Sequence, residues 1–173
     1  MITEEQLAKI RLLALDVDGV LTDGSIIIGQ EGELSKHFDA RDGMGISLAL
    51  RHGIQVALIT GRHSEIVLHR AMELGISSVY ENVVFKGKGP GARPPTNWIF
   101  PLEETAFMGD DLNDLPAFSK AAVTLGSGGR RLRKSGNGPC WYLPAQEGHG
   151  AVRDVIERIL KAKGTVGRNH PQL

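Results

Sequence analysis

Four short apolar runs lack the alternation of a half-exposed strand, and this restricts the fold more than any other feature of the chain. The runs cover residues 10–17, 56–59, 106–108 and 122–125. Continuous apolar runs of this length are typical of strands that are buried on both faces of a parallel sheet. Segments with helical spacing lie between them, so strand and helix alternate. The sequence therefore predicts an α/β fold, a three-layer sandwich with a mostly parallel, Rossmann-like central sheet.

Glycines and polar caps mark the ends of the predicted helices. Residues 44–50 are followed by Gly53, and residues 66–74 are followed by Gly75. A short helix is expected at the N-terminus, where a threonine and a glutamine have capping-box spacing. Two further helices are predicted from apolar stripes, one formed by Leu112, Leu115 and Phe118, and one formed by Val152, Val155, Ile156, Ile159 and Leu160 ahead of Gly164.

Residues 22–38 interrupt the alternation of strand and helix. β-Branched residues are followed there by glycine and glutamate and then by a second short run, which predicts a β-hairpin flap after the first strand. We expect residues 1–164 to form a single domain, with irregular segments rich in glycine and proline at about 87–100 and 126–140. Residues 165–173 have no apolar period, and we expect them to form a disordered tail.

Charge and cysteine content narrow the possible partners. Lysine plus arginine equals aspartate plus glutamate at 20 each, so no net charge attracts nucleic acid or an anionic membrane. The single cysteine cannot form an intrachain disulfide and fits a reducing compartment. No apolar run has the length of a membrane span. We therefore expect a cytoplasmic protein whose partner is a small molecule.

The first predicted strand ends in the pair Asp16 and Asp18. A carboxylate next to a phosphate is repelled unless a divalent cation lies between them, so the pair makes chemical sense with bound Mg²⁺. Asp16 would attack phosphorus as a nucleophile, and Asp18 would give a proton to the leaving alcohol and later take one from water. A polar turn without catalytic function has the same local pattern.

Two further clusters are candidates to hold the phosphate group. The second strand is followed by Thr60, Gly61 and Arg62, whose hydroxyl and backbone N–H groups can bind phosphate oxygens, although an ordinary threonine-capped turn looks the same. Lys86 is the candidate to neutralise charge on the phosphoryl oxygens, with Lys88 as its competitor.

The fourth cluster is acidic and follows the third strand. Adjacent carboxylates at a buried strand end repel one another unless a cation compensates their charge. Asp110 is therefore the predicted direct metal ligand, with Asp111 a further candidate and Asp114 acting through water or as a helix N-terminal charge. The four clusters in this order, each after a predicted strand or near one, predict a catalytic site that binds phosphate and metal.

These residues identify a family. Asp16, Asp18, Thr60, Lys86 and the pair Asp110–Asp111 resemble the four motifs of haloacid dehalogenase phosphatases. Residues 21–24, 38–46 and 148–153 are similar to the 3-deoxy-D-manno-octulosonate 8-phosphate phosphatase subfamily. The resemblance implies the haloacid dehalogenase fold without a large cap, Mg²⁺ as cofactor held by Asp16, Asp18, Asp110 and Asp111, a role in lipopolysaccharide biosynthesis, and a homotetramer whose neighbouring subunits help to close each site.

The resemblance also implies substrate contacts outside the four motifs. It places Arg41 and Asp42 near the sugar acid, and the segment that ends at Arg153 at an active site. Physical reasoning alone leaves each arginine open, because Arg41 can equally form a surface salt bridge and Arg153 can lie on the polar face of the last helix. Two segments depart from the family pattern by losing helical spacing, residues 89–95 and 126–139.

Three alternatives remain at the level of sequence. A signalling receiver domain also combines an acidic cluster, a phosphorylated aspartate, a threonine and a lysine, but there the acidic pair comes before the phosphorylated aspartate. A catalytically silent scaffold is a second alternative. Within the phosphatase interpretation, a nine-carbon keto-sugar acid phosphate would use the same core, because specificity lies in loops and subunit contacts.

Overall fold

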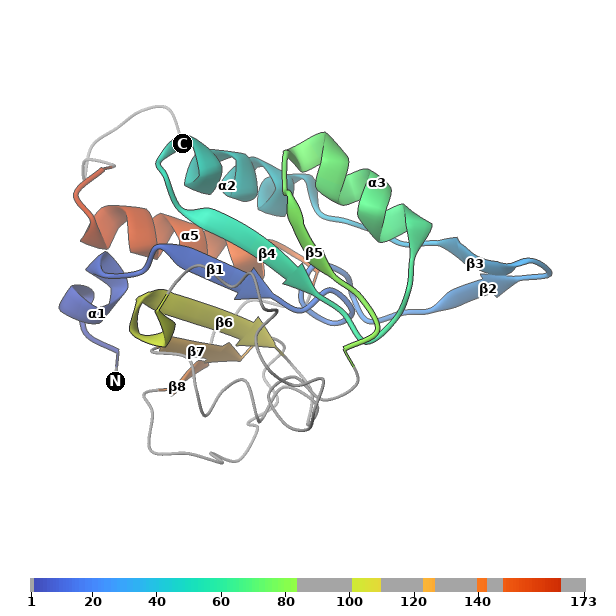
Figure 1. Cartoon of the computed structure of the whole chain (residues 1–173), viewed down its shortest axis with the longest axis horizontal. Coiled ribbons are helices and arrows are strands. Elements are labelled where there is room, and N and C mark those ends of the chain that lie inside the picture. Colours follow the sequence, from blue (N-terminus) through green and yellow to red (C-terminus); the bar gives the residue numbers. More distant parts are fainter. Residues whose placement is uncertain (1, 84–100, 110–122, 127–139, 143–147, 166–173) are drawn as a thin grey trace.

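The computed structural model describes residues 2–83, 101–109, 123–126, 140–142 and 148–165. Six strands form one sheet in the order β5-β4-β1-β6-β7-β8, and every neighbouring pair is parallel (Figure 1). The order places β1 between β4 and β6, at the centre of the sheet. The strands are β1 Leu12–Leu15, β4 Gln55–Ile59, β5 Ser78–Tyr80, β6 Thr105–Gly109, β7 Val123–Gly126 and β8 Cys140–Tyr142.

Four α-helices and one 3-10 turn accompany the sheet in the described residues. They are α1 Glu4–Ala8, α2 Ala40–Arg51, α3 Glu65–Leu74, η1 Leu102–Glu104 and α5 Ala151–Ala162. Helices α2 and α5 pack closely against each other, and with α3 they lie on the same side of the sheet in Figure 1. The apolar stripe predicted for the last helix is buried in α5, from Val152 to Leu160.

The alternation of side chains along β1 divides the core between the two faces of the sheet. Leu13 and Leu15 join the large cluster that α2 and α5 cover. Ala14 points to the opposite face and forms a smaller cluster with Ile59 and Phe107. All four residues of β1 are buried, which is the pattern that a continuous apolar run predicts for a central parallel strand.

The predicted hairpin is present between β1 and α2. Strands β2 Ile27–Gly29 and β3 Gly32–Ser35 pair antiparallel in a separate two-stranded sheet. Gly32 has a φ of 122°, which only glycine adopts readily, so it fixes the turn. The hairpin projects from the body of the molecule and is the only insertion in the described chain between β1 and α2 (Figure 1). No large cap domain is found there.

The α/β fold class is confirmed, while some element limits differ from those predicted. Strands β5 and β8 were not predicted, because each has only three residues. Helix α2 begins earlier than its apolar spacing suggests, since Asp39 caps it through a hydrogen bond from the Arg41 N–H. The predicted helix of Leu112, Leu115 and Phe118 lies outside the described residues.

None of the helices in the described ranges has both the length and the apolarity that crossing a bilayer requires.

Candidate active site

The strand order brings the sequence clusters to one edge of the sheet. Strand β1 ends at Leu15, and the N–H of Asp16 continues the ladder by donating to the Met108 carbonyl of β6 at 2.9 Å. On the other side, β4 ends at Ile59, directly before Thr60. Because parallel strands have their carboxyl ends at the same edge, Asp16 and Thr60 leave the sheet from neighbouring strands there.

Asp16 and Asp18 differ in their surroundings. Asp16 is only 8% exposed, and its Oδ1 accepts a hydrogen bond from the Val17 N–H at 2.7 Å. Asp18 lies in the following loop, and its Oδ1 accepts from the Lys36 ammonium at 2.6 Å. The other oxygen of Asp18, Oδ2, receives no hydrogen bond from any residue within the described ranges. Among the described residues, one carboxylate oxygen of Asp18 is therefore left for a ligand.

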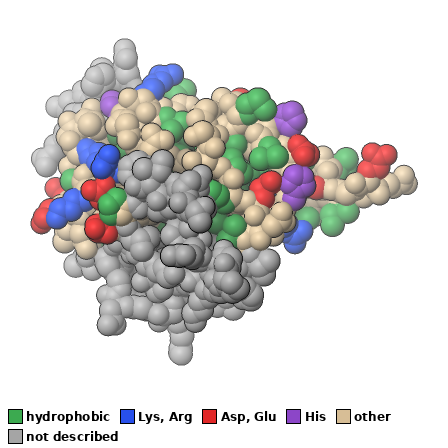
Figure 2. All heavy atoms as spheres, viewed as in Figure 1, with side chains coloured by type: hydrophobic (Ala, Val, Ile, Leu, Met, Phe, Trp, Pro, Cys, Tyr) green, Lys and Arg blue, Asp and Glu red, His purple; other side chains and the backbone are tan. Residues whose placement is uncertain are grey.

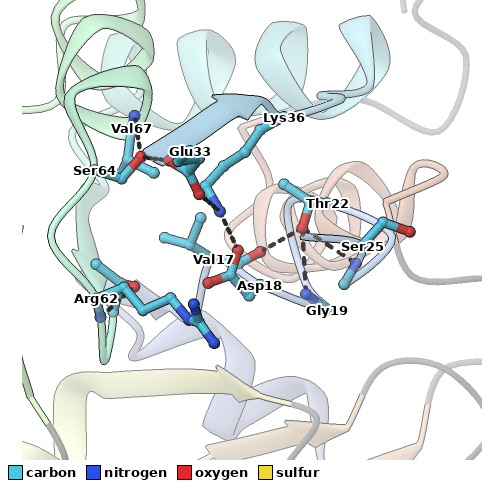
Figure 3. A network of polar contacts seen from close by, with 12 residues as sticks. Val17, Asp18, Gly19, Thr22, Ser25, Glu33, Lys36, Arg62, Ser64 and Val67 are labelled. Carbon is cyan, nitrogen blue, oxygen red and sulfur yellow. Dashed lines mark hydrogen bonds and ion pairs between the residues drawn. The ribbon is translucent and has the colours of Figure 1, made fainter. Parts of the chain in front are cut away.

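Lys36 follows β3 and bridges two carboxylates (Figure 3). Its side chain is 1% exposed, and its Nζ lies 2.7 Å from Glu33 Oε1 as well as near Asp18. Burial on its own would lower the pKa of the ammonium, but the hydrogen bonds and charges of Asp18 and Glu33 raise that pKa above its ordinary value. Lys36 is therefore a buried, charged link between the hairpin and the loop that carries Asp18.

The same network reaches helix α3. The Ser64 hydroxyl caps α3 by accepting from the Val67 N–H, and it also donates to Glu33. Burial alone would raise the pKa of Glu33, but Lys36 and Ser64 lower it. The Ser64 N–H donates to Glu81 at 2.9 Å, and this hydrogen bond is the main reason that the pKa of Glu81 is lowered. The carboxylates of Glu33 and Glu81 thus both hold Ser64, the residue that caps the start of α3.

Thr60 lies in a turn that its own side chain and backbone hold in place. Its residue is 2% exposed, and its Oγ1 accepts from the Arg62 N–H at 3.2 Å. The backbone is held on both sides, since the Thr60 N–H donates to the Tyr80 carbonyl and the Thr60 carbonyl accepts from the Val83 N–H. Arg62 is exposed, and its guanidinium extends toward Asp18 (Figure 3). Arg62 therefore connects the turn after β4 with the loop after β1, and binding of phosphate by Thr60, Gly61 and Arg62 stays a prediction.

Several predicted site residues lie outside the described residues: Lys86, Lys88, Asp110, Asp111 and Asp114. Strand β6 ends at Gly109 beside the end of β1, one position before Asp110 in the sequence. In the described ranges, no group of three or more histidine, cysteine, aspartate or glutamate side chains is placed to hold a metal ion. The described part of the predicted metal site consists of Asp16 and Asp18.

Asp42, Arg41 and Arg153 join α2 to α5 in this structure. Asp42 is 1% exposed, and its two oxygens accept from the backbone N–H groups of Gly150 and Arg153 at 3.2 and 2.8 Å. Burial raises the pKa of this carboxyl, and the two N–H groups oppose that shift. Asp42 thereby caps a helix that has no side-chain cap at Gly150.

The two arginines are engaged within the chain. The Arg41 guanidinium binds Asp39 and donates to the His149 carbonyl at 2.8 Å, whereas Arg153 pairs with Glu157 at 2.8 Å. Arg41 therefore forms the salt bridge, and Arg153 the position on a helix face, that physical reasoning allowed for each of them. Contact of Arg41, Asp42 and Arg153 with a substrate stays a prediction.

Sequence reasoning missed Lys36, Glu33 and Ser64. Lys36 is separated from Asp18 by 18 positions, and their contact depends on where the chain returns from the hairpin at the end of β3. The only local signal is the spacing of three between Glu33 and Lys36, a common spacing that does not distinguish a site from a surface pair.

Curated relatives match most of the chain. No family model matches it. A 3-deoxy-D-manno-octulosonate 8-phosphate phosphatase of Escherichia coli strain K12 is 39% identical over 156 residues, which are 90% of this chain and 82% of that protein. Its counterpart in Yersinia pestis is 36% identical over 162 residues, covering 92% of this chain and 84% of that protein.

Solved structures of related phosphatases also superpose on most of this chain. The crystal structure of the Yersinia pestis phosphatase superposes with a TM-score of 0.83 at 34% identity, covering 93% of this chain and 86% of that chain. A Moraxella catarrhalis phosphatase of the same name, crystallised with a magnesium ion, a phosphate ion and a KDO molecule, superposes with a TM-score of 0.80 at 35% identity. That alignment covers 94% of this chain and 92% of the Moraxella chain.

Proposed function

We propose, because this chain belongs to the 3-deoxy-D-manno-octulosonate 8-phosphate phosphatase family of the haloacid dehalogenase superfamily, that it is a magnesium-dependent phosphomonoesterase that hydrolyses this sugar phosphate to the free sugar acid and phosphate. The proposal rests on where three residues leave the sheet. Asp16 and Asp18 follow the central strand β1, and Thr60 follows its neighbour β4 at the same edge of the sheet. The site thus combines a nucleophile, an acid–base group and a phosphate-binding turn.

The first half-reaction transfers the phosphoryl group to the protein. A carboxylate oxygen of Asp16 attacks phosphorus, and the bond between phosphorus and the sugar oxygen breaks. The electron pair of that bond goes to the sugar oxygen, which takes a proton from the carboxyl group of Asp18. The products are the free sugar acid and an acyl phosphate on Asp16. Thr60 and the exposed Arg62 orient the phosphoryl oxygens during this step.

The second half-reaction restores the protein. A water molecule gives a proton to Asp18 and attacks phosphorus, and the bond between phosphorus and the Asp16 oxygen breaks with its electron pair returning to the carboxylate. Inorganic phosphate leaves, and Asp18 again carries the proton needed for the next turnover. In the structure Lys36 contacts only Oδ1 of Asp18, so Oδ2 is the oxygen on which this proton is carried.

The residues of the site fit a magnesium ion. Mg²⁺ prefers carboxylate and other hard oxygen ligands, and Asp16 presents a nearly buried carboxylate at the strand end. We assign Asp16, Asp18, Asp110 and Asp111 to hold the ion, as the family motifs imply; Asp18 would do so through its backbone carbonyl, because its Oδ1 meets Lys36 and its Oδ2 carries the proton. When bound, the ion supplies positive charge that offsets the repulsion between the Asp16 carboxylate and the phosphate dianion.

A comparison of phosphate esters tests the substrate. We expect 3-deoxy-D-manno-octulosonate 8-phosphate to give the highest kcat/KM for phosphate release in a panel that includes nine-carbon keto-sugar acid phosphates and simple hexose phosphates. The reason is that a substrate carboxylate and a matched chain length add contacts that simple sugars lack. Equal kcat/KM values across the panel would contradict this specificity. Turnover of any ester also excludes a receiver domain and a silent scaffold.

The hairpin supports a proposal for assembly. Ile28 and Leu34 are 70% and 68% exposed, and Ile26 is 41% exposed. Figure 2 shows hydrophobic side chains on this projecting element. Exposed apolar side chains grouped on one element are typical of a surface that a partner covers. We propose that the covering partner is the hairpin of further copies of this chain, in a homotetramer in which a neighbouring subunit helps to close each active site.

Substitutions in the hairpin test the assembly. We expect the wild-type chain to have the mass of a tetramer by light scattering, and the double variant Ile28→Asp with Leu34→Asp to have the mass of a monomer, because buried unpaired carboxylates oppose association. The matched control is Ile28→Val with Leu34→Met, which keeps both positions apolar and should remain tetrameric. A wild-type monomer, or an aspartate variant that stays tetrameric, would refute the hairpin interface.

The cellular setting follows from the same family membership. We propose that the chain acts in the cytoplasm, in the supply of the eight-carbon sugar acid for lipopolysaccharide biosynthesis. An assay of soluble and membrane fractions for this phosphatase activity tests the location, and activity confined to the membrane fraction would contradict it.

A further inference from the structure

Lys36 has a position that the four catalytic clusters do not account for. It follows the hairpin strand β3, yet its side chain is 1% exposed and its ammonium lies between Asp18 and Glu33 at 2.6 and 2.7 Å (Figure 3). Lysine is almost never fully buried unless it is paired, and placing its charge out of water is costly without such partners. The two carboxylates therefore hold this lysine at a defined place beside the catalytic loop.

We propose that Lys36 is a positioning residue for the phosphatase reaction, holding the Asp18 carboxylate in the orientation that serves the leaving oxygen. The inference rests on the proposed function, since it assigns Asp18 the acid–base role. Lys36 contacts Asp18 through Oδ1. Oδ2 receives no hydrogen bond from the described residues, and a carboxyl group held through one oxygen with the other available is the arrangement that proton transfer to a leaving group needs.

The position of Lys36 is itself fixed by a chain of contacts. Glu33 holds the ammonium from the hairpin, and the Ser64 hydroxyl, which caps α3, holds Glu33. The Asp18 side chain is 23% exposed and would otherwise move among several rotamers. A displacement of about 1 Å at a reacting group can reduce a rate about 100-fold, so an anchor of this kind has a measurable effect on turnover.

Two other roles for Lys36 make different predictions. If Lys36 only attaches the hairpin to the body, its loss lowers activity on every substrate by the same factor. If Lys36 binds the phosphoryl group, its loss also affects all phosphate esters alike. A residue that positions the proton donor matters only when the leaving group needs a proton. Phenyl phosphate and 4-nitrophenyl phosphate separate these cases, because they have similar shapes but 4-nitrophenolate leaves without protonation.

The test is Lys36→Met assayed on both aryl esters. We expect kcat/KM for phenyl phosphate to fall about 10- to 100-fold, and kcat/KM for 4-nitrophenyl phosphate to fall less than about 3-fold, since general acid catalysis contributes about 10²- to 10⁴-fold where it is needed. Lys36→Arg keeps the cation and is expected to restore part of the phenyl phosphate activity. In an Asp18→Asn background, Lys36→Met should cause no further selective loss.

The results distinguish this inference from the proposed function. A wild-type chain that releases no phosphate from any ester overturns both. An active wild type whose Lys36→Met variant loses activity equally on both aryl esters, or loses none, overturns the positioning role alone. If Lys36→Met fails to fold by circular dichroism, Glu33→Gln is used for the same ratio, because it removes the negative charge that anchors Lys36 but keeps the ammonium. A uniform or absent effect of Glu33→Gln then counts against the inference.

Discussion

Replacement of Asp16 by asparagine is expected to reduce kcat at least about 10³-fold, because a neutral amide oxygen is a far poorer nucleophile than a carboxylate. The fold should be retained. Asparagine is nearly isosteric with aspartate, and its side-chain oxygen can still accept the hydrogen bond from the Val17 N–H that Asp16 Oδ1 accepts at 2.7 Å. Steady-state phosphate release measures the rate, and thermal unfolding followed by circular dichroism measures the fold.

A matched substitution controls for the loss of one negative charge. Glu4 is an exposed residue in the first turn of α1, which precedes β1, and Glu4→Gln should leave kcat within about 2-fold of wild type, because exposed charges away from a site have small effects. An Asp16→Asn variant with the kcat of wild type would refute the covalent role of Asp16. A variant that is inactive because it is unfolded would be recognised by its circular dichroism spectrum.

Removal of Mg²⁺ is expected to lower the rate by a similar factor. Two unit charges about 4 Å apart repel by about 4 kcal/mol at an effective dielectric constant of about 20. An uncompensated barrier of that size corresponds to a rate loss of about 10³-fold. We therefore expect a chelator to reduce phosphate release to background, and added Mg²⁺ to restore it at constant ionic strength.

The magnesium dependence also tests one ligand. Asp110→Asn should raise the Mg²⁺ concentration that gives half-maximal rate, because an amide is a weaker ligand than a carboxylate for a hard cation. Glu4→Gln should leave that concentration unchanged. A chelated wild-type protein that retains its full rate would contradict the metal-dependent mechanism.

The central sheet could be predicted because its signal is local. Each of β1, β4, β6 and β7 is a short apolar run, and burial on both faces of a parallel sheet produces that pattern without reference to the rest of the chain. The ends of α3 and α5 were predictable for the same reason, since Gly75 and Gly164 adopt positive φ where each helix stops. Three-residue strands such as β5 carry too few residues for such a pattern.

The candidate site was predictable only where its residues follow strands. Asp16, Asp18 and Thr60 come directly after β1 and β4, so strand order alone brings them together. The contacts that Lys36 and Asp42 make within the chain could not be predicted from sequence, because each meets its partner through packing between separate elements. The substrate contact that the resemblance implies for Asp42 stays a prediction, and its described contacts are the backbone N–H groups that begin α5.

The stereochemical course at phosphorus tests the central claim, that Asp16 carries the phosphoryl group, most directly. Each in-line displacement inverts the configuration at phosphorus, so transfer to Asp16 followed by attack of water inverts it twice. A substrate whose phosphoryl group is chiral through oxygen isotopes is therefore expected to give inorganic phosphate with retained configuration. Inversion would show that water attacks the substrate directly and would contradict the account.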